Sequence, residues 1–280
     1  MIVDAHHHLW DPGRRAYPWL DDAALAPIHR PYRLDDLRRE TRRAGVTRTV
    51  LVQTLPSVAE TAEFLDIARR SQGLIGGVVG WVDLTEQAVA ETIAGLRALP
   101  GGEHLVGIRH QAQDEREPDW LLREDVVRGL AAVADAGLVY DLLVLPHQLP
   151  AAIAAVQRVP HGRFVLDHAA KPPIRDGRLE PWAGRLRQLA AHPNTACKLS
   201  GLVTEADWGT WEVDDLRPYA DVVMEAFGAH RVLAGSDWPV CELAASYDQV
   251  WQAVGALLEP LAHDERTAVL GATAARTYRL

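Results

Sequence analysis

The chain alternates short apolar runs with longer segments in which apolar residues recur every three to four positions. The short runs are rich in β-branched and other apolar residues, which suit a buried, pleated strand. The longer segments have the spacing of amphipathic helices. We predict strands within 1–10, 47–54, 74–84, 104–111, 138–144, 163–169, 195–201 and 231–237. We predict helices over 34–44, 57–71, 86–99, 120–136, 148–157, 181–191 and 213–227, with two more after the last strand.

This alternation of strand and helix is typical of parallel sheets with crossover helices. Nearly every predicted strand is a continuous apolar run, as expected for strands that are buried on both faces. We therefore predict an α/β fold, a (β/α)8 TIM barrel, as a single domain over residues 1–280. A doubly wound open sheet is the competing arrangement, but no G-x-G-x-x-G or G-x-x-x-x-G-K-[ST] motif follows any predicted strand.

One loop, residues 11–32, is much longer than the others. Loops of this length in a compact domain are usually functional or disordered. Trp10, Tyr17 and Trp19 favour an ordered loop that folds over a site.

Composition narrows the classes of partner and location. The 280 residues are 48% hydrophobic, enough for a large core, and the formal net charge is -9. The one dense basic stretch, 30–43, contains acidic residues as well, so we expect no nucleic-acid partner. Neither a membrane span nor a signal peptide is recognisable. Cys197 and Cys241 form no CxxC pair, which argues against a disulfide framework or cysteine zinc site and favours a reducing cytoplasm.

Polar side chains collect where the predicted strands end. His6 and His8 follow the first apolar run and alternate onto the same face. Arg109 lies on the fourth strand, His168 follows the sixth and Asp237 follows the eighth. The carboxyl ends of barrel strands meet at one mouth, where the active sites of such barrels are built. We therefore predict that these five side chains converge, and that the three consecutive histidines are a strand end and not a tag remnant.

This set of residues allows two kinds of chemistry. Three imidazoles, from His6, His8 and His168, with the Asp237 carboxylate suit one zinc or another borderline divalent ion with open positions for water. The same groups can hold and activate water without a metal, with Asp237 accepting the proton. Arg109 is permanently charged and suits an oxyanion or a substrate carboxylate.

A structural role is the alternative for each of these residues taken singly, because most buried polar groups at strand ends are simply hydrogen-bonded. Arg109 in particular can pair with a carboxylate on a neighbouring strand. Asp4 is expected on the face of His6, as its support. Three further polar residues alternate out of register, so we expect them to pack or cap: His7, His110 and Asp167.

Nucleophilic catalysis is not indicated by the motifs. Ser236 lies in GSDWP, which is not the G-x-S-x-G of a nucleophile elbow. Cys197 lies inside a predicted strand, where a small buried side chain is expected.

The chain resembles the amidohydrolase superfamily, in the amidohydrolase-2 branch that contains sugar-acid lactonases of the L-fuconolactonase and L-rhamnonolactonase type. The resemblance runs nearly end to end. It is carried by DAHHHLWDP (4–12), YPWL (17–20), VGIRHQAQDE (106–115), YDLLV (140–144), LDHAAKPPI (166–174), CKLSGLVTEA (197–206) and GSDWPVCELAASY (235–247). Many binuclear members of the superfamily carry a bridging lysine on strand four, whereas this chain has Ile108, Arg109 and His110 there, which argues against a binuclear site.

The resemblance implies a hydrolase that opens a sugar-acid lactone. In it, Asp237 would activate water, His168 would meet the lactone carbonyl or the metal, and Arg109 would lie near the substrate. His6 and His8 would match the family's H-x-H pair, around one zinc that related lactonases can dispense with. We list as candidates for the pocket wall Tyr17, Trp19, Trp81, Gln111, Lys171 and Trp238. There are two alternatives. One is a zinc-dependent decarboxylase or another hydrolase of the branch, and the other is a sugar-acid binding protein without activity. Each of these functions is compatible with a homo-oligomer.

Overall fold

Eight parallel strands form one sheet that curves into a barrel. The computed structural model describes residues 1–280 and orders the strands β1 to β8. Their bounds are β1 (Val3–His7), β2 (Arg48–Val52), β3 (Ile75–Gly80), β4 (Leu105–His110), β5 (Val139–Leu142), β6 (Arg163–Leu166), β7 (Thr195–Leu199) and β8 (Val232–Ala234). The backbone N–H of His8 donates to Trp238 O (2.7 Å) and that of Asp237 to His6 O (2.8 Å), which joins β1 to the segment after β8. The predicted (β/α)8 fold is confirmed.

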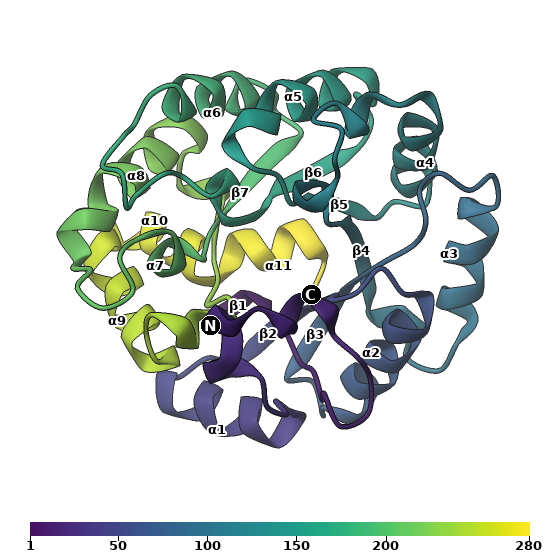
Figure 1. The fold of residues 1–280 in the computed structure, drawn as a ribbon, viewed down its shortest axis with the longest axis horizontal. Coiled ribbons are helices and arrows are strands. Elements are labelled where there is room, and N and C mark those ends of the chain that lie inside the picture. Colours follow the sequence, from purple (N-terminus) through teal and green to yellow (C-terminus); the bar gives the residue numbers. More distant parts are fainter.

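Helices surround the strands on the outside of the barrel (Figure 1). They are α1 (Leu34–Ala44), α2 (Val58–Arg70), α3 (Val89–Ala98), α4 (Glu124–Asp135), α5 (Leu149–Arg158), α6 (Trp182–Ala190), α7 (Leu202–Glu205), α8 (Val213–Phe227), α9 (Tyr247–Leu258), α10 (His263–Thr267) and α11 (Thr273–Tyr278). No helix combines the length and the apolar character that a membrane span requires.

Several predicted bounds differ from the observed ones. The third strand ends at Gly80 and not at 84, and the helix predicted over 120–136 is a 3-10 turn (Trp120–Leu122) followed by α4. The short helix α7 was not predicted. The two helices expected at the C-terminus are three, and a wider π-type turn (Ala268–Ala272) joins α10 to α11. These elements are one or two turns long, too short for a periodic pattern to reveal.

Local signals explain where the helices begin and end. The Ser57 hydroxyl accepts from Glu60 N (3.2 Å) at the start of α2, as an N-cap. Gly45 ends α1 in the left-handed region, with φ 70° and ψ 17°. Helix α2 packs so closely on β3 that a Cβ at Gly80 would lie 2.3 Å from Thr61 Cγ2, so this position requires glycine.

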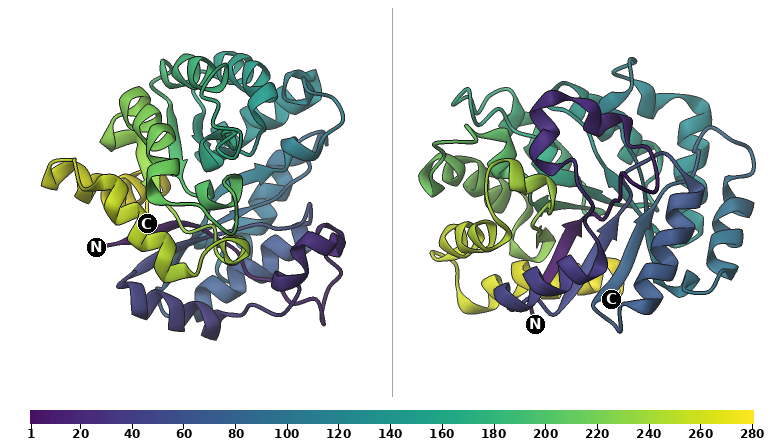
Figure 2. Two further views of the ribbon diagram at one scale, coloured as in Figure 1. Left: turned by 60° about the vertical axis from the view of Figure 1, so that its left-hand side comes forward. Right: turned by 60° about the horizontal axis from the view of Figure 1, so that its bottom comes forward.

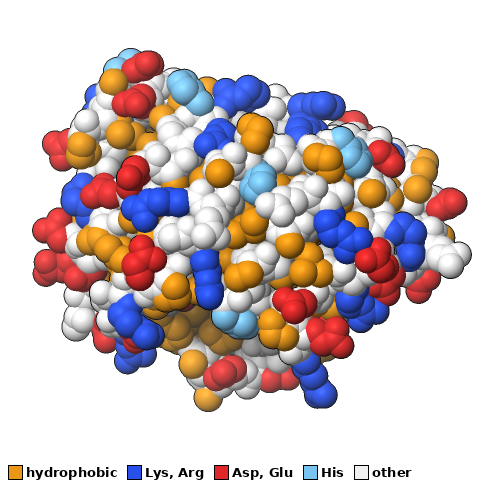
Figure 3. Space-filling view, turned by 90° about the horizontal axis from the view of Figure 1, so that it is seen from above, with side chains coloured by type: hydrophobic (Ala, Val, Ile, Leu, Met, Phe, Trp, Pro, Cys, Tyr) orange, Lys and Arg blue, Asp and Glu red, His pale blue; other side chains and the backbone are white.

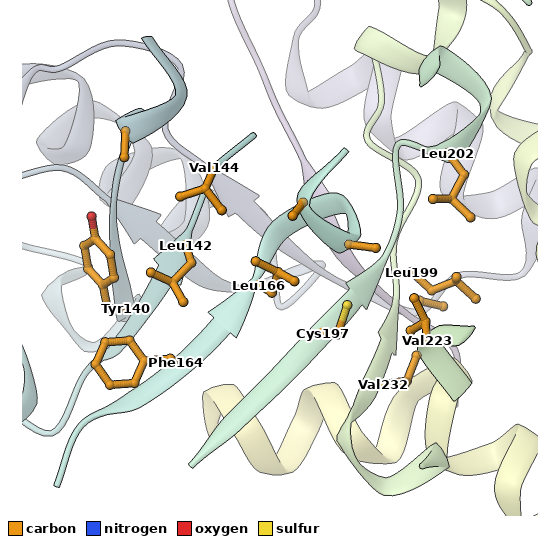
Figure 4. Packing of buried hydrophobic residues seen from close by; sticks show 14 of the residues in the cluster. Tyr140, Leu142, Val144, Phe164, Leu166, Cys197, Leu199, Leu202, Val223 and Val232 are labelled. Atoms are coloured by element: carbon orange, nitrogen blue, oxygen red, sulfur yellow. The ribbon is translucent and has the colours of Figure 1, made fainter. Parts of the chain in front are cut away.

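The apolar core has two parts. A large cluster lies between the strands and the helices, and Figure 4 shows the part of it that includes Leu142, Leu166 and Leu199. A second cluster fills the amino end of the barrel with side chains from the strands. Its members are Val3, Ala5, Val50, Val52, Val79, Val139, Val165, Ala196 and Leu233, together with Ala274 and Tyr278 of α11. Helix α11 therefore closes this end of the barrel.

The long loop of residues 11–32 is ordered, as predicted. It contains two 3-10 turns, η1 (Pro18–Asp21) and η2 (Ala23–Ile28). Trp10 pairs with Tyr32 through backbone hydrogen bonds, and its indole N–H donates to Ile28 O (3.2 Å). In the right-hand view of Figure 2 this loop, in dark purple, lies at the opposite end of the barrel from both termini. The loop thus covers the carboxyl ends of the strands.

The surface carries charges of both signs. On the face drawn in Figure 3, acidic and basic side chains are interspersed, and neither sign forms a continuous patch.

Candidate active site

The structure brings the five predicted side chains together at the carboxyl ends of the strands. His8, Arg109, His168 and Asp237 line a cavity of about 360 Å³, a size typical of small-molecule sites. His6 lies beneath them and is fully buried. The cavity is therefore a pocket with a histidine and carboxylate floor.

Three ligand-type atoms on this floor have the spacing that a tetrahedral metal ion requires. His6 Nε2 and His8 Nε2 are 3.1 Å apart, and Asp237 Oδ1 lies 3.7 Å from the first and 3.5 Å from the second. Ligands at about 2.0 Å from a tetrahedral zinc lie roughly 3.3 Å from one another. His168 Nε2 lies 3.8 Å from the same Asp237 oxygen.

The hydrogen bonds behind two of these histidines also fit a metal. His8 Nδ1 lies 2.8 Å from the carbonyl of Val52, so this nitrogen carries the proton and Nε2 has a free lone pair. His168 Nδ1 lies 2.9 Å from Ser200 Oγ, which can donate or accept. Such outer partners orient metal-binding imidazoles. The residues present fit one borderline divalent ion.

Left-handed backbone at two strand ends delivers the polar side chains. After β6, four consecutive residues have positive φ: His168 (51°), Ala169 (50°), Ala170 (59°) and Lys171 (51°). After β8, Asp237 has φ 57°. Non-glycine residues adopt this conformation at a cost, and it is concentrated at functional sites.

Because the chain turns left-handed directly after β6, both Asp167 and His168 reach the centre of the barrel. The prediction that Asp167 alternates away from the site was wrong. Its Oδ2 accepts from Arg109 Nη1 at 3.0 Å, and its Oδ1 lies 3.4 Å from His6 Nδ1. Strict alternation applies only while the backbone stays extended.

A fully buried ion-pair network lies beneath the site, and the sequence analysis missed it. Lys198 Nζ lies 2.5 Å from Asp141 Oδ2, 2.9 Å from Asp167 Oδ1 and 3.1 Å from His6 Nδ1. The Tyr278 hydroxyl of α11 lies 2.9 Å from both Asp141 oxygens. The sequence does contain a signal for this network. Lys198 lies in the middle of the apolar strand TACKLSG, and a lysine is almost never fully buried unless it is paired, so a buried acidic partner could have been predicted.

Arg109 both faces the cavity and pairs with a carboxylate of a neighbouring segment. Its guanidinium donates to Asp167 Oδ2 (3.0 Å), to Gln53 Oε1 (3.1 Å from Nε and 2.9 Å from Nη2) and to Gln53 O (2.5 Å). Most of its donors are therefore used inside the protein. Its main contribution to the pocket floor is a fixed positive charge, because few of its N–H groups are free to donate to a ligand.

Burial and neighbouring charges set the protonation of the floor. Burial lowers the pKa of His168 to about 4, so its imidazole is neutral near pH 7. Burial alone would raise the pKa of Asp237, but His168 and His8 outweigh it and the pKa lies below its ordinary 3.8. Asp237 is therefore an ionised carboxylate beside a neutral His168, a state suited to accept a proton or to hold a cation.

The six candidates for the pocket wall divide into two groups. Trp19, Gln111 and Lys171 line the cavity. Tyr17, Trp81 and Trp238 do not. The Tyr17 hydroxyl accepts a hydrogen bond from Asp11 N (3.4 Å). The indole N–H of Trp81 donates to His110 (3.0 Å), and that of Trp238 donates to Glu242 (2.8 Å). The polar atoms of these three side chains are therefore held by the protein. Further lining residues were not predicted, among them Thr204, Glu205 and Trp208.

The remaining polar residues at the strand ends have structural roles. His7 Nε2 contacts Thr49 Oγ1 (2.9 Å), and His110 contacts Glu115 (2.9 Å) and stacks on Trp120, so these two pack as predicted.

Asp4 does not share the face of His6, which corrects that expectation. The pairing of β1 with β2 shifts register between Asp4 and His7. Asp4 therefore shares a face of the strand with His7 and not with His6. Asp4 instead accepts from Ser236 N (2.8 Å), Ser236 Oγ (2.6 Å) and Tyr247 OH (3.0 Å), and from the backbone N–H of His6 (3.2 Å). It supports His6 through the backbone and ties β1 to the end of β8.

Active sites of (β/α)8 barrels lie at this end, and histidines with a carboxylate are the donor set of hydrolytic metal centres. The fold and the site thus define a barrel enzyme of the hydrolytic type. Comparison with known proteins makes the assignment specific: the family model described as amidohydrolase matches residues 3–280, and the chain belongs to that family. The resemblance seen in the motifs is confirmed.

Two relatives match over nearly their full length. The chain is 39% identical to the L-fucono-1,5-lactonase of Burkholderia ambifaria over 285 residues, covering 99% of this chain and 95% of that protein. It is 40% identical to the L-fucono-1,5-lactonase of Burkholderia multivorans over 291 residues, covering 100% and 96%. A crystal structure of an amidohydrolase from Burkholderia multivorans with bound zinc superposes with a TM-score of 0.92 at 40% identity, covering 100% and 99%.

Proposed function

We propose that this protein hydrolyses a sugar-acid lactone of the L-fucono- or L-rhamnono-lactone kind. The observation that carries the proposal is an ionised Asp237 facing a pocket of about 360 Å³ beside neutral His168, on a chain about 40% identical to two L-fucono-1,5-lactonases. A lactone needs a positioned water and a base, and this floor offers both functions. The size of the cavity suits one small ring and not a polymer.

In the proposed reaction, Asp237 accepts a proton from a water molecule whose oxygen attacks the lactone carbonyl carbon. Negative charge then develops on the carbonyl oxygen, where His168 donates a hydrogen bond through Nε2 and Arg109 supplies positive charge. The bond between the carbonyl carbon and the ring oxygen breaks, and the proton held by Asp237 passes to the leaving alkoxide. The product is the open-chain hydroxy acid.

His6, His8, His168 and Asp237 would hold a single metal ion, with zinc the expected one. In that form His168 Nε2 would be a ligand and not a donor to the carbonyl oxygen, because a neutral imidazole nitrogen cannot be both. When bound, the ion would act as a Lewis acid and lower the pKa of water at the site. His8 is kept in the required tautomer by Val52 O, and Ser200 can accept from His168 Nδ1. The chain's own residues then serve to orient the ligands and to take up the proton.

Two charged side chains in the cavity are free to bind substrate hydroxyls. Glu205 and Lys171 both line the pocket, and neither side chain makes a hydrogen bond or an ion pair within the chain. Burial raises the pKa of Glu205, as expected for a carboxylate withdrawn from water. We assign Glu205 to accept hydrogen bonds from ring hydroxyls, and Lys171 to donate to a hydroxyl or to the carbonyl. Trp19 and Trp208 offer apolar faces to the sugar ring.

Acid release from a panel of sugar 1,4- and 1,5-lactones tests the proposal, with a pH indicator and chelator-treated protein. Hydrolysis above the spontaneous rate supports a lactonase and makes the metal dispensable. Activity that returns only with added zinc supports the lactonase with an essential metal centre. Silence under both conditions would overturn the proposal. Carbon dioxide release from aromatic acids would then identify the decarboxylase alternative, and saturable binding without turnover would identify the binding protein.

A further inference from the structure

The buried ammonium of Lys198 directly contacts a predicted metal ligand. Its side chain is fully buried, and Nζ hydrogen-bonds to Asp141 Oδ2 at 2.5 Å and to His6 Nδ1 at 3.1 Å, while Asp167 Oδ1 forms an ion pair with it at 2.9 Å. A lysine ammonium has N–H donors and no acceptor. Lys198 therefore acts as a donor toward both of its hydrogen-bond partners.

This contact favours one tautomer of His6. Because Lys198 can only donate, His6 Nδ1 offers a lone pair when the contact is a hydrogen bond, and a neutral imidazole then has its proton on Nε2. That N–H faces His8 Nε2 at 3.1 Å. His8 accepts there, because its own proton is on Nδ1 and is donated to Val52 O at 2.8 Å. The chain of donors from Lys198 to Val52 is complete.

Holding a cation requires the other tautomer of His6. Its Nε2 would need a free lone pair, so its proton would move to Nδ1 and require an acceptor there. The acceptor available there is Asp167 Oδ1, which lies 3.4 Å from His6 Nδ1 and has no other hydrogen-bond partner of suitable geometry. Arg109 Nη1, 3.3 Å from His6 Nε2, also fits only this second tautomer. The same atoms thus support two arrangements, and Lys198 keeps its hydrogen bond to His6 in only one.

We propose that Lys198 is a positioning residue that sets the tautomer of His6 and thereby weakens metal binding at the histidine cluster. In the first arrangement Lys198 donates to His6 and the cluster is complete without a cation. In the second, Lys198 loses an acceptor in a site where water cannot replace it, which opposes metal binding. This inference rests on the metal centre proposed above, but it involves no lactone chemistry.

The variant that tests it must remove the ammonium without leaving a buried charge. Lys198→Met alone would leave two carboxylates facing each other, so it is combined with Asp141→Asn, which keeps the net charge unchanged. Tyr278→Phe is the matched control, because it removes the other hydrogen bonds to Asp141 and leaves the contact between Lys198 and His6. Circular dichroism verifies the fold of each variant.

Two measurements on metal-free protein decide the question. Nitrogen-15 spectra of labelled histidine give the tautomer of His6, with its signal identified by its loss in His6→Gln. Competition with a chromogenic chelator gives the zinc Kd. We expect the Nε2–H tautomer in the unmodified protein and in Tyr278→Phe. We expect the Nδ1–H tautomer in the double variant, with zinc bound about tenfold or more tightly, the usual size of effects from partners of ligand histidines.

An Nδ1–H tautomer in the unmodified protein would overturn the inference, and this result does not depend on any variant folding. An unchanged or weaker zinc affinity in the double variant would overturn it too, as would an equal change in Tyr278→Phe. A protein that binds zinc as expected but hydrolyses no lactone would overturn the proposed function and leave this inference standing.

Discussion

Gly201→Ala should damage the site by displacing His168. Gly201 follows β7 with φ 65° and ψ 10°, and a Cβ there would lie 2.7 Å from His168 Nδ1 and 3.2 Å from Asp237 Oδ2. Ordinary contact begins at 3.4 Å, so the imidazole must retreat by several tenths of an ångström. Its contact with Ser200 Oγ, 2.9 Å long, would be strained at the same time.

The expected magnitude has a backbone part and a site part. Placing alanine in the left-handed region costs about 1–2 kcal/mol of unfolding free energy. Weakening the hydrogen bond to Ser200 adds about 1 kcal/mol. Misplacing a catalytic group by about 1 Å can cost roughly 100-fold in rate, so we expect kcat to fall by about that factor.

Gly45→Ala separates the two parts. Gly45 has nearly the same backbone conformation, with φ 70° and ψ 17°, and a Cβ there would contact nothing within 4 Å. This control should lower the melting temperature by about 2–8 °C, from the same backbone cost, and leave kcat unchanged. The assay is steady-state lactone hydrolysis beside thermal unfolding of both variants.

The reasoning would be refuted if Gly201→Ala kept the kcat of the unmodified protein, since the imidazole would then tolerate the intrusion. It would be refuted equally if Gly45→Ala lost as much activity, because the loss would then reflect general destabilisation.

Other predictions concern the same pocket. Asp237→Asn should lower kcat by about 100-fold to 10,000-fold while thermal unfolding shows an intact fold, because the amide cannot accept a proton; unaltered turnover would eliminate Asp237 as the base. The pH profile of kcat/KM should be flat from pH 7 to about 5, because the pKa of His168 is lowered to about 4 and that of Asp237, the base, lies below 3.8, so neither group changes its protonation in this range; an acid limb centred near 6.5 would contradict the burial of His168. Glu205→Gln should raise KM about tenfold for hydroxylated lactones but not for unsubstituted δ-valerolactone, since it loses a charged hydrogen bond to the ring; an equal change for both substrates would show that Glu205 acts on the carbonyl instead.

Local patterns along the chain were sufficient to predict the barrel and the end at which the site lies. Strand and helix periodicities are properties of short segments, and alternation along the chain leaves few topologies. His6, His8, Arg109, His168 and Asp237 are brought together because the carboxyl ends of parallel strands must meet at one mouth. Their placement followed from the order of the elements and needed no knowledge of their contacts.

Which way each side chain points at the ends of the strands was decided by the tertiary structure. The register shift in β1 places Asp4 with His7, and the left-handed turn after β6 brings Asp167 in beside His168. Both depend on how the strands close into a barrel, which no short window of sequence specifies. The same closure decides that Trp19 lines the pocket and Trp238 does not.

The buried network shows this division most clearly. Lys198 and Asp141 are visible in the sequence as charges within apolar strands, but these two partners lie 57 residues apart along the chain, and Tyr278 lies 137 residues from Asp141. A buried charge must find a partner, and the sequence alone establishes that need. Only the closed barrel, with α11 across its amino end, determines that these partners meet beneath His6.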